Sequence, residues 1–316
     1  MRSTFFSACL FILFSAFAHA AVEHPPGSRV ALPDGRKVWI ESEGQGDPVL
    51  LLVGGPANSH VTFHPAFSQL AQTHRVIYLD YYGRGRSEWP ADLHEITFAR
   101  DVRDVAAVIE TLKLGPVSVY GYSYGGLVAQ QLTLDHPQLV RRLVLANTLY
   151  SPVMWQLNHE NVNREIENQF PELWRQIEAL HLCGMPSTDP LIQDKIRSVA
   201  SAVARFYDPS AAATALTEPG AVNRALYPVF TGEDVDFAVG GEVVRIPDFR
   251  PRLKEIRVPM LIIAGRYDRA LYPKLQMEFK IAAPQARFVM MERSGSAVHL
   301  EQTDELMALL RDFLAA

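Results

Sequence analysis

One short stretch constrains the fold more than any other. Gly121-Tyr122-Ser123-Tyr124-Gly125 stands directly between residues 116–120, typical of a buried strand, and residues 126–134, whose apolar side chains have helical spacing. A serine at such a junction lies on a sharp turn that aims its hydroxyl out of the sheet. The glycines fit because a Cβ there would collide with a neighbouring strand or helix. The pattern predicts a nucleophile at Ser123.

The composition bounds the class of protein. The chain has 316 residues, enough for one large domain or one domain with a sizeable insertion. Hydrophobic residues make up 48% and charged residues 21%, which is typical of a globular protein. The net charge is -5 and no basic run is present, so we expect no nucleic-acid partner.

Residues 1–20 have the pattern of a signal peptide. Arg2 supplies a positive start, Phe5–Phe17 is almost entirely apolar, and Ala18-His19-Ala20 is a small-residue cleavage site. The apolar stretch is shorter than the ~20 residues that a membrane span needs. We therefore expect a secreted or periplasmic protein that starts near Ala21 and has no membrane partner after cleavage. The alternative is an uncleaved N-terminal anchor.

The cysteines exclude an internal disulfide. Cys9 lies in the predicted leader, and its removal leaves Cys183 alone. Cys183 has no adjacent base, so we expect it to be a packing residue and not a nucleophile.

The order of apolar segments predicts an α/β fold. Short strands are expected at 49–53, 75–81, 117–120, 143–146, 259–264 and 287–291, and helices at 98–112, 274–282 and 301–314. Continuous apolar strands that alternate with helices indicate a mostly parallel sheet with helices on both faces. The segment 38–41, after the Asp34-Gly35 turn, suggests an antiparallel hairpin at one edge.

Residues 151–251 interrupt this alternation. Helical patterns cover 155–170, 171–182 and 191–207, so we expect a helical lid inserted into a core made of 21–150 and 252–316. A lid over the carboxyl ends of the strands would shape access for a substrate. The alternative is an independent second domain, for which no linker-like composition is present.

Four motifs in order resemble the α/β-hydrolase superfamily, and most closely the serine hydrolases of the proline iminopeptidase type. They are residues 51–57 (Leu-Leu-Val-Gly-Gly-Pro-Ala), residues 80–87, the serine turn and residues 265–268 (Gly-Arg-Tyr-Asp). The resemblance covers nearly all of residues 30–314. It implies hydrolysis of an ester or amide through an acyl-enzyme, without a cofactor. It also implies a small-molecule or peptide substrate, such as an N-terminal proline or a small amino-acid amide.

In this family the catalytic residues follow the order nucleophile, acid, histidine. Asp268 comes directly after a predicted strand, where the acid is expected; its other interpretation is a turn or helix-capping aspartate. His299 is the one histidine after Asp268, so it is the candidate base.

The histidine position departs from the family pattern. The base usually follows the glycine of a Ser-Gly-His turn, whereas here Ser294-Gly295 precedes Ser296, and His299 stands three residues later. Either His299 reaches Ser123 from this shifted position or it is a structural histidine. The second outcome makes the protein a catalytically impaired, hydrolase-like binding protein.

The resemblance also places the oxyanion hole. Its donors are the backbone N–H groups of Gly55 and Tyr124. Family members commonly have His-Gly-Gly-Pro-Gly here, and Val53 and Ala57 replace the outer residues. Because the donors are backbone groups, the exchange of these side chains leaves them in place.

The remaining motifs point to no ligand. Gly83-Arg84-Gly85 lacks the lysine and the spacing of a nucleotide-binding loop, so we interpret it as a structural turn. The scattered histidines lack metal-ligand spacing with nearby carboxylates; they are His60, His64, His74 and His94. We therefore predict no metal and no cofactor. A third class, a cofactor-free dehalogenase or epoxide hydrolase, needs an aspartate at the position of Ser123. The serine argues against this class.

Overall fold

The computed structural model describes residues 22–315. The predicted signal peptide and its cleavage boundary lie outside these residues. Among the described residues, none of the helices combines the length and the apolar character that crossing a bilayer requires.

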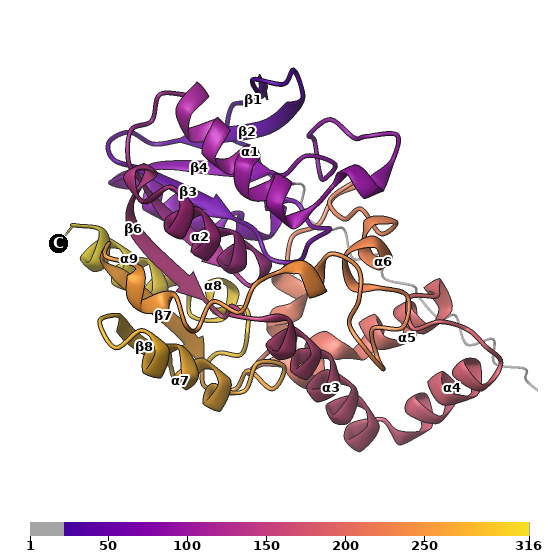
Figure 1. The fold of residues 1–316 in the computed structure, drawn as a ribbon. Helices are drawn as coiled ribbons and strands as arrows, with labels where there is room; N and C mark the ends of the chain where they lie inside the picture. The colour runs from indigo at the N-terminus through magenta and orange to yellow at the C-terminus, as the bar shows by residue number, and fades with distance from the viewer. Residues whose placement is uncertain (1–21, 316) are drawn as a thin grey trace, which may run out of the picture.

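The core is one eight-stranded sheet (Figure 1), in the order β1-β2-β4-β3-β5-β6-β7-β8. The strands are β1 (Gly27–Ala31), β2 (Lys37–Glu43), β3 (Pro48–Leu52), β4 (Arg75–Asp80), β5 (Val117–Tyr122), β6 (Val140–Ala146), β7 (Met260–Gly265) and β8 (Arg287–Met291). The pairs β1–β2 and β2–β4 are antiparallel, and all the others are parallel. The predicted α/β class, mostly parallel with an edge hairpin, is confirmed.

Helices and short turns complete the core. Its helices are α1 (Phe98–Thr111), α2 (Tyr124–Asp135), α7 (Pro273–Ala282), α8 (Val298–Glu301) and α9 (Thr303–Ala315). Short 3-10 turns lie in the core at His60–Phe63 (η1), Ala66–Gln72 (η2), Leu93–Glu95 and Pro137–Leu139, and between β6 and β7 at Pro209–Thr214, Val243–Arg245 and Leu253–Glu255. Helix α2 packs on β3, β5 and β6 and contacts α1.

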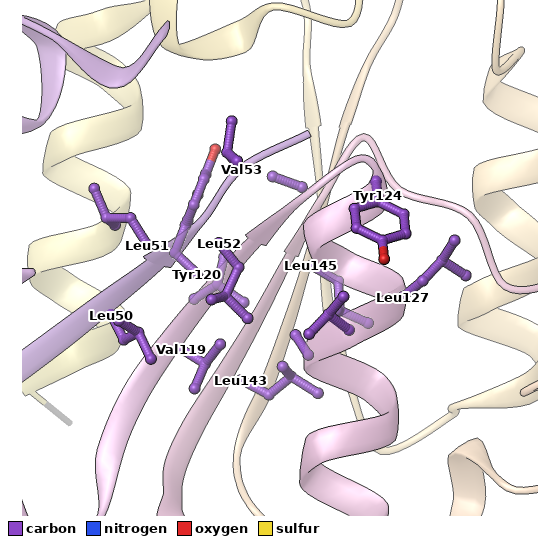
Figure 2. Close-up of a cluster of buried hydrophobic side chains, with 14 of the residues drawn as sticks. Leu50, Leu51, Leu52, Val53, Val119, Tyr120, Tyr124, Leu127, Leu143 and Leu145 are labelled. Atoms are coloured by element: carbon purple, nitrogen blue, oxygen red, sulfur yellow. The ribbon is translucent and has the colours of Figure 1, made fainter. Parts of the chain in front are cut away.

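The central strands are buried on both faces because their sequences are continuously apolar. Figure 2 shows the side chains of β3, β5 and β6 packed together, with Leu127 and Tyr124 of α2 beside them. The buried set includes Leu50, Leu51, Leu52, Val119, Leu143 and Leu145. This rigid layer fixes the ends of β3 and β5, where the predicted nucleophile and oxyanion donors lie.

A helical segment stands between β6 and β7, on one side of the sheet (Figure 1). It contains α3 (Pro152–Gln169), α4 (Pro171–Leu182), α5 (Pro190–Ala200) and α6 (Leu226–Thr231), and it has a small apolar cluster of its own. The helix expected over 191–207 ends at Ala200 and continues as one π-helical turn, Ser201–Arg205. That turn brings Arg205 close to the core.

The expectation that Cys183 packs inside the protein is wrong. Cys183 is exposed and has a free thiol. The reason is its position just after α4, where Gly184 adopts a φ of 83° and turns the chain away.

Candidate active site

Ser123 lies on the strained turn that the sequence predicts. Its φ of 50° and ψ of -118° are rare for a residue with a side chain, and they join β5 directly to α2. A Cβ on Gly125 would lie 2.0 Å from the carbonyl oxygen of Leu52, so only glycine fits there. Close packing of the two elements therefore forces the turn and presents the serine at the end of β5.

The turn after β3 lies against this serine. A Cβ on Gly54 would come within 2.8 Å of the Cβ of Ser123, and Gly55 has a φ of 75°. Tyr124 is the first residue of α2, so its N–H has no partner within the helix and lies at the positive end of the helix dipole. Gly55 and Tyr124 are thus placed beside Ser123 from two sides.

The glycine-rich segment after β4 supports this arrangement. Arg84 is fully buried, and its Nε donates to the carbonyl oxygen of Pro56 at 2.7 Å. The same guanidinium binds both carboxylate oxygens of Asp101, at 2.8 and 2.7 Å. The Tyr124 hydroxyl also donates to Asp101, at 2.6 Å. The segment thus ties the turn after β3 to the start of α2.

Ser123 opens onto a cavity of about 460 Å³ between the core and the inserted helices. The core contributes Gly55, Thr62, Tyr122, Ser123, Ala297 and His299 to its wall, and the inserted segment contributes Trp155, His159, Arg205, Tyr227 and Asp236. Ser123 is half-buried, so its hydroxyl is accessible from the cavity. The inserted helices thus cover the carboxyl ends of the strands, where ligands bind in open α/β sheets.

His299 lies in the same cavity wall but without the partners of a catalytic base. Its ring packs edge-on against Phe63 and Tyr122, with centroids 5.7 and 5.0 Å away. Its Nε2 is 3.4 Å from Thr62 Oγ1, and its buried Nδ1 has no hydrogen bond to any described residue. Burial lowers the pKa of His299 to about 4. The imidazole is therefore neutral at pH 7.

Asp268 is fully buried beyond the end of β7. Its Oδ1 accepts hydrogen bonds from the backbone N–H groups of Ala270 and Leu271, at 3.0 and 2.8 Å. Asn147 Nδ2 donates to Oδ2 at 3.2 Å. Burial raises the pKa of this carboxyl despite these bonds. Within residues 22–315, no hydrogen bond joins His299 to Asp268 or to Ser123. The structure brings Ser123 and His299 into one cavity, and the relay through Asp268 stays a prediction.

Known proteins share this architecture. The alpha/beta hydrolase fold family matches residues 47–181. A proline iminopeptidase of Lactobacillus helveticus is 30% identical over 278 residues, which cover 84% of this chain and 89% of the relative. This chain belongs to the α/β-hydrolase family. Within it, the chain is proline iminopeptidase-like: the enzyme of that name from Heyndrickxia coagulans is 25% identical over 87% of this chain and 93% of its own.

Solved structures of α/β hydrolases agree with the fold. The proline iminopeptidase of Mycobacterium smegmatis superposes with a TM-score of 0.72 at 22% identity, covering 91% of this chain and 98% of its own. An esterase from Exiguobacterium antarcticum gives 0.61 at 22% identity, covering 92% and 100%. These structures show the shared fold, and the proline iminopeptidase relatives identify the protein as a hydrolase.

The family's usual base position is occupied by a serine beside the acid. Ser296 is buried, and its hydroxyl is among the groups that offset the rise in the pKa of Asp268. Even so, Ser296 Oγ forms no well-aligned hydrogen bond with any described residue. The predicted acid, Asp268, thus lies beside Ser296, at the position where the family resemblance places the imidazole.

Two charged residues of the cavity escaped the sequence analysis. Arg205 forms no ion pair with the rest of the described chain, and it is close enough to influence the pKa values of Tyr122 and Asp268. Asp236 Oδ2 is buried without a hydrogen bond, and burial raises the pKa of this carboxyl. The sequence held no signal for Arg205, because its place depends on the π-helical turn after α5.

Proposed function

We propose that this protein hydrolyses ester or amide bonds through an acyl-enzyme on Ser123. The observation that carries the proposal is the strained turn at Ser123, packed against Gly54 and open to a cavity that also contains a neutral imidazole. Backbone strain costs about 1–3 kcal/mol and tends to persist at functional sites. A chain that kept this turn without using the hydroxyl would lose stability for no gain.

In the proposed reaction, Ser123 Oγ attacks the carbonyl carbon while His299 takes the hydroxyl proton. The N–H groups of Gly55 and Tyr124 stabilise the oxyanion of the tetrahedral intermediate. The imidazolium returns the proton to the leaving group, and water then cleaves the acyl-serine ester. Asp268 orients the imidazole in this scheme. The two side chains therefore have to approach each other in the substrate complex, since such hydrogen bonds often tighten on binding.

Labelling with a fluorophosphonate tests the nucleophile and the base together. We expect stoichiometric labelling of the wild type and none of Ser123→Ala. We expect His299→Ala to slow labelling by about 100-fold or more, since general bases contribute roughly 10²–10⁴. Ser198→Ala is the matched control, because Ser198 is exposed on α5. Unchanged labelling in His299→Ala would remove this histidine from the mechanism.

The second candidate function is that of a hydrolase-like binding protein with little turnover. Ser296 favours it, because a hydroxyl stands where the base should be and Asp268 has no imidazole to orient. The same labelling decides between the two. A wild-type protein that takes no label, although it folds and a Ser296→His variant is labelled, supports this candidate and overturns the first.

The substrate class that we propose is an N-terminal prolyl amide or a small amino-acid amide, in line with the proline iminopeptidase relatives. An amino terminus needs a carboxylate nearby, and Asp236 lines the cavity; its Oδ2 accepts no hydrogen bond from any described residue and lies 3.7 Å from His181 Nε2. We expect proline β-naphthylamide to be cleaved, and Asp236→Asn to raise KM for it more than KM for an uncharged ester. Equal KM changes for both substrates would contradict this assignment.

We also propose that the protein is secreted or periplasmic, on the basis of the leader pattern in residues 1–20. N-terminal sequencing of the exported protein should begin near Ala21. Recovery of the full chain from the membrane fraction would instead indicate the uncleaved anchor.

A further inference from the structure

Three histidines from distant parts of the chain surround one buried carboxylate, outside the cavity of Ser123. His24 precedes β1, Glu41 lies in β2, and His60 and His64 lie at the start and just after the end of η1. Glu41 Oε2 is 3.0 Å from His24 Nδ1, 3.0 Å from His60 Nε2 and 3.3 Å from His64 Nε2. One ligand atom of each residue lies within 4.8 Å of all the others.

His24 Nδ1 is within hydrogen-bond distance of Glu41 Oε2, but three other ring nitrogens of the cluster have no hydrogen bond within the described chain. His60 Nε2 and both ring nitrogens of His64 are buried without a hydrogen bond to any described residue. Two of them lie near Glu41 Oε2, but neither ring is aimed at it. Buried polar atoms without partners are rare in proteins, and an ion is one of the few explanations.

The geometry of the rings fits a single ion. The three imidazoles stand edge-on to one another at similar centroid separations, 5.7, 5.6 and 5.4 Å. With tetrahedral ligands about 2.0–2.1 Å from zinc, neighbouring ligand atoms are roughly 3.3 Å apart. The contacts of 3.0–3.3 Å to Glu41 match this spacing.

Outer partners hold two of the rings in the tautomer that a metal needs. His60 Nδ1 donates to Asp80 Oδ1 at 2.7 Å, which leaves a lone pair on Nε2. His24 Nε2 donates to Glu218 Oε2 at 2.9 Å, which leaves Nδ1 free to coordinate. Metal-bound histidines are usually oriented by carboxylates in this way.

The local charge also favours a dication. Three carboxylates meet here, those of Glu41, Asp80 and Glu218, and Arg86 is the one guanidinium that contacts Glu41 and Glu218 among the described residues. An ion of charge +2 would bring this group of four charges to zero. Glu41 Oε1 already accepts a hydrogen bond from Trp39 Nε1 at 2.8 Å, so Oε2 is the oxygen left for an ion.

We propose that His24, His60, His64 and Glu41 bind one divalent transition-metal ion, with Zn²⁺ as the best match to three imidazoles and one carboxylate. Four protein ligands close the coordination sphere, so the ion is structural. It ties the start of the described chain to β2 and η1. Because η1 also contains Thr62, which faces His299, the ion would stabilise one wall of the cavity.

Metal titration tests the proposal on the folded mature chain. The background variant is Cys183→Ser, because the exposed thiol could bind zinc by itself. After treatment with a chelator, isothermal titration with ZnCl₂ should give one site per chain and raise Tm, since the ion binds the folded state. Glu41→Gln and His64→Ala should each weaken binding by at least 100-fold. Loss of the outer partner in Glu218→Gln should weaken it by about 10-fold.

Two further variants keep the result interpretable. His24→Ala changes a partly exposed ligand close to the predicted N-terminus, so it reports on the site even if Glu41→Gln does not fold. His94→Ala removes an exposed histidine outside the cluster and should change nothing. Absence of a Tm shift in the wild type, or equal zinc affinity in the wild type, His24→Ala and His64→Ala, overturns the proposal. If zinc does not shift the Tm of the wild type, a proton and not a metal ion offsets the negative charge of the cluster.

Discussion

Two buried histidines, His60 and His299, reach opposite protonation states. His60 is completely buried between the carboxylates of Asp80 and Glu41, and without a metal ion these contacts overcome burial and raise its pKa to about 9; the proposed ion would take the place of that proton. His299 is equally buried among aromatic rings, without a carboxylate, and burial lowers its pKa to about 4. The partner, and not the depth of burial, decides the protonation state.

The comparison bears directly on catalysis. A serine hydrolase needs its imidazole paired with a carboxylate, because the ion pair stabilises the imidazolium that forms during attack. This chain builds such a histidine–aspartate pair, His60 with Asp80, but outside the cavity of Ser123. His299 lines the cavity, whereas Asp268, the predicted acid, is fully buried outside its lining and has no hydrogen bond to His299.

The largest expected effect comes from giving the cavity a paired histidine. Ser296→His would place an imidazole beside Asp268, at the family's usual base position. We expect kcat/KM for ester hydrolysis to be about 10²–10⁴ higher in the double variant Ser296→His, His299→Ala than in His299→Ala alone, the range that general bases contribute. Steady-state assays with a p-nitrophenyl ester measure it.

The controls for this variant separate the new base from the old one. Ser296→Ala should leave the rate near that of the wild type. In Ser296→His with His299 intact, the rate should be at least that of the wild type. A double variant that folds but is no faster than His299→Ala would mean that Asp268 and Ser123 are not placed for a shared imidazole.

The next effect concerns stability, and its sign follows from the low pKa of His299. Between about pH 4 and the ordinary histidine value near 6.5, the unfolded state binds a proton that the folded state does not. The contribution of the depressed His299 pKa to the free energy of unfolding is complete above pH 6.5 and is lost as the pH falls towards 4. It amounts to at most roughly 3 kcal/mol.

Urea unfolding at pH 7 and pH 4.5 measures this contribution. His299→Gln should remove part of the fall in unfolding free energy, whereas the exposed control His94→Gln should not change it. His159 is also buried, and burial lowers its pKa to about 3, so a residual slope of the same sign remains. An identical fall in the wild type and in His299→Gln would show that His299 is accessible to protons in the folded state.

Much of the sheet could be predicted because it depends on local sequence. The apolar runs at 49–53 and 287–291 became β3 and β8, and the two glycines around Ser123 located the turn. Periodicity did not show the break after Ala200, because the apolar stripe continues through a π-helical turn that tertiary contacts impose.

The histidine cluster around Glu41 was missed for a different physical reason. Its ligands come from residues 24, 41, 60 and 64, and only the pairing of β2 with β1 and β4 brings the first two to η1. One local signal was present: His60 and His64 have the spacing of many zinc-binding histidine pairs. Their carboxylate lies about twenty residues away in the sequence, so spacing alone could not find it.

The smallest predicted effect tests the charge of the cavity. The cluster around Glu41 is rich in carboxylates, whereas the cavity presents Arg205 without an ion pair among the described residues. A hydrogen bond to a charged group contributes about 1.5–3 kcal/mol. In Arg205→Met we therefore expect KM to rise by about 10-fold for an ester whose acyl group carries a carboxylate.

KM values for substrates of different charge show whether Arg205 acts through its charge. KM for the uncharged ester of the same length should stay within about two-fold, and Arg205→Lys should recover part of the loss, since it keeps the charge but not the planar fork. For a cationic prolyl substrate, removal of the guanidinium should lower KM slightly, because a like charge leaves the cavity. If all three substrates lose equally, Arg205 holds the π-helical turn in place and does not select the charge of the substrate.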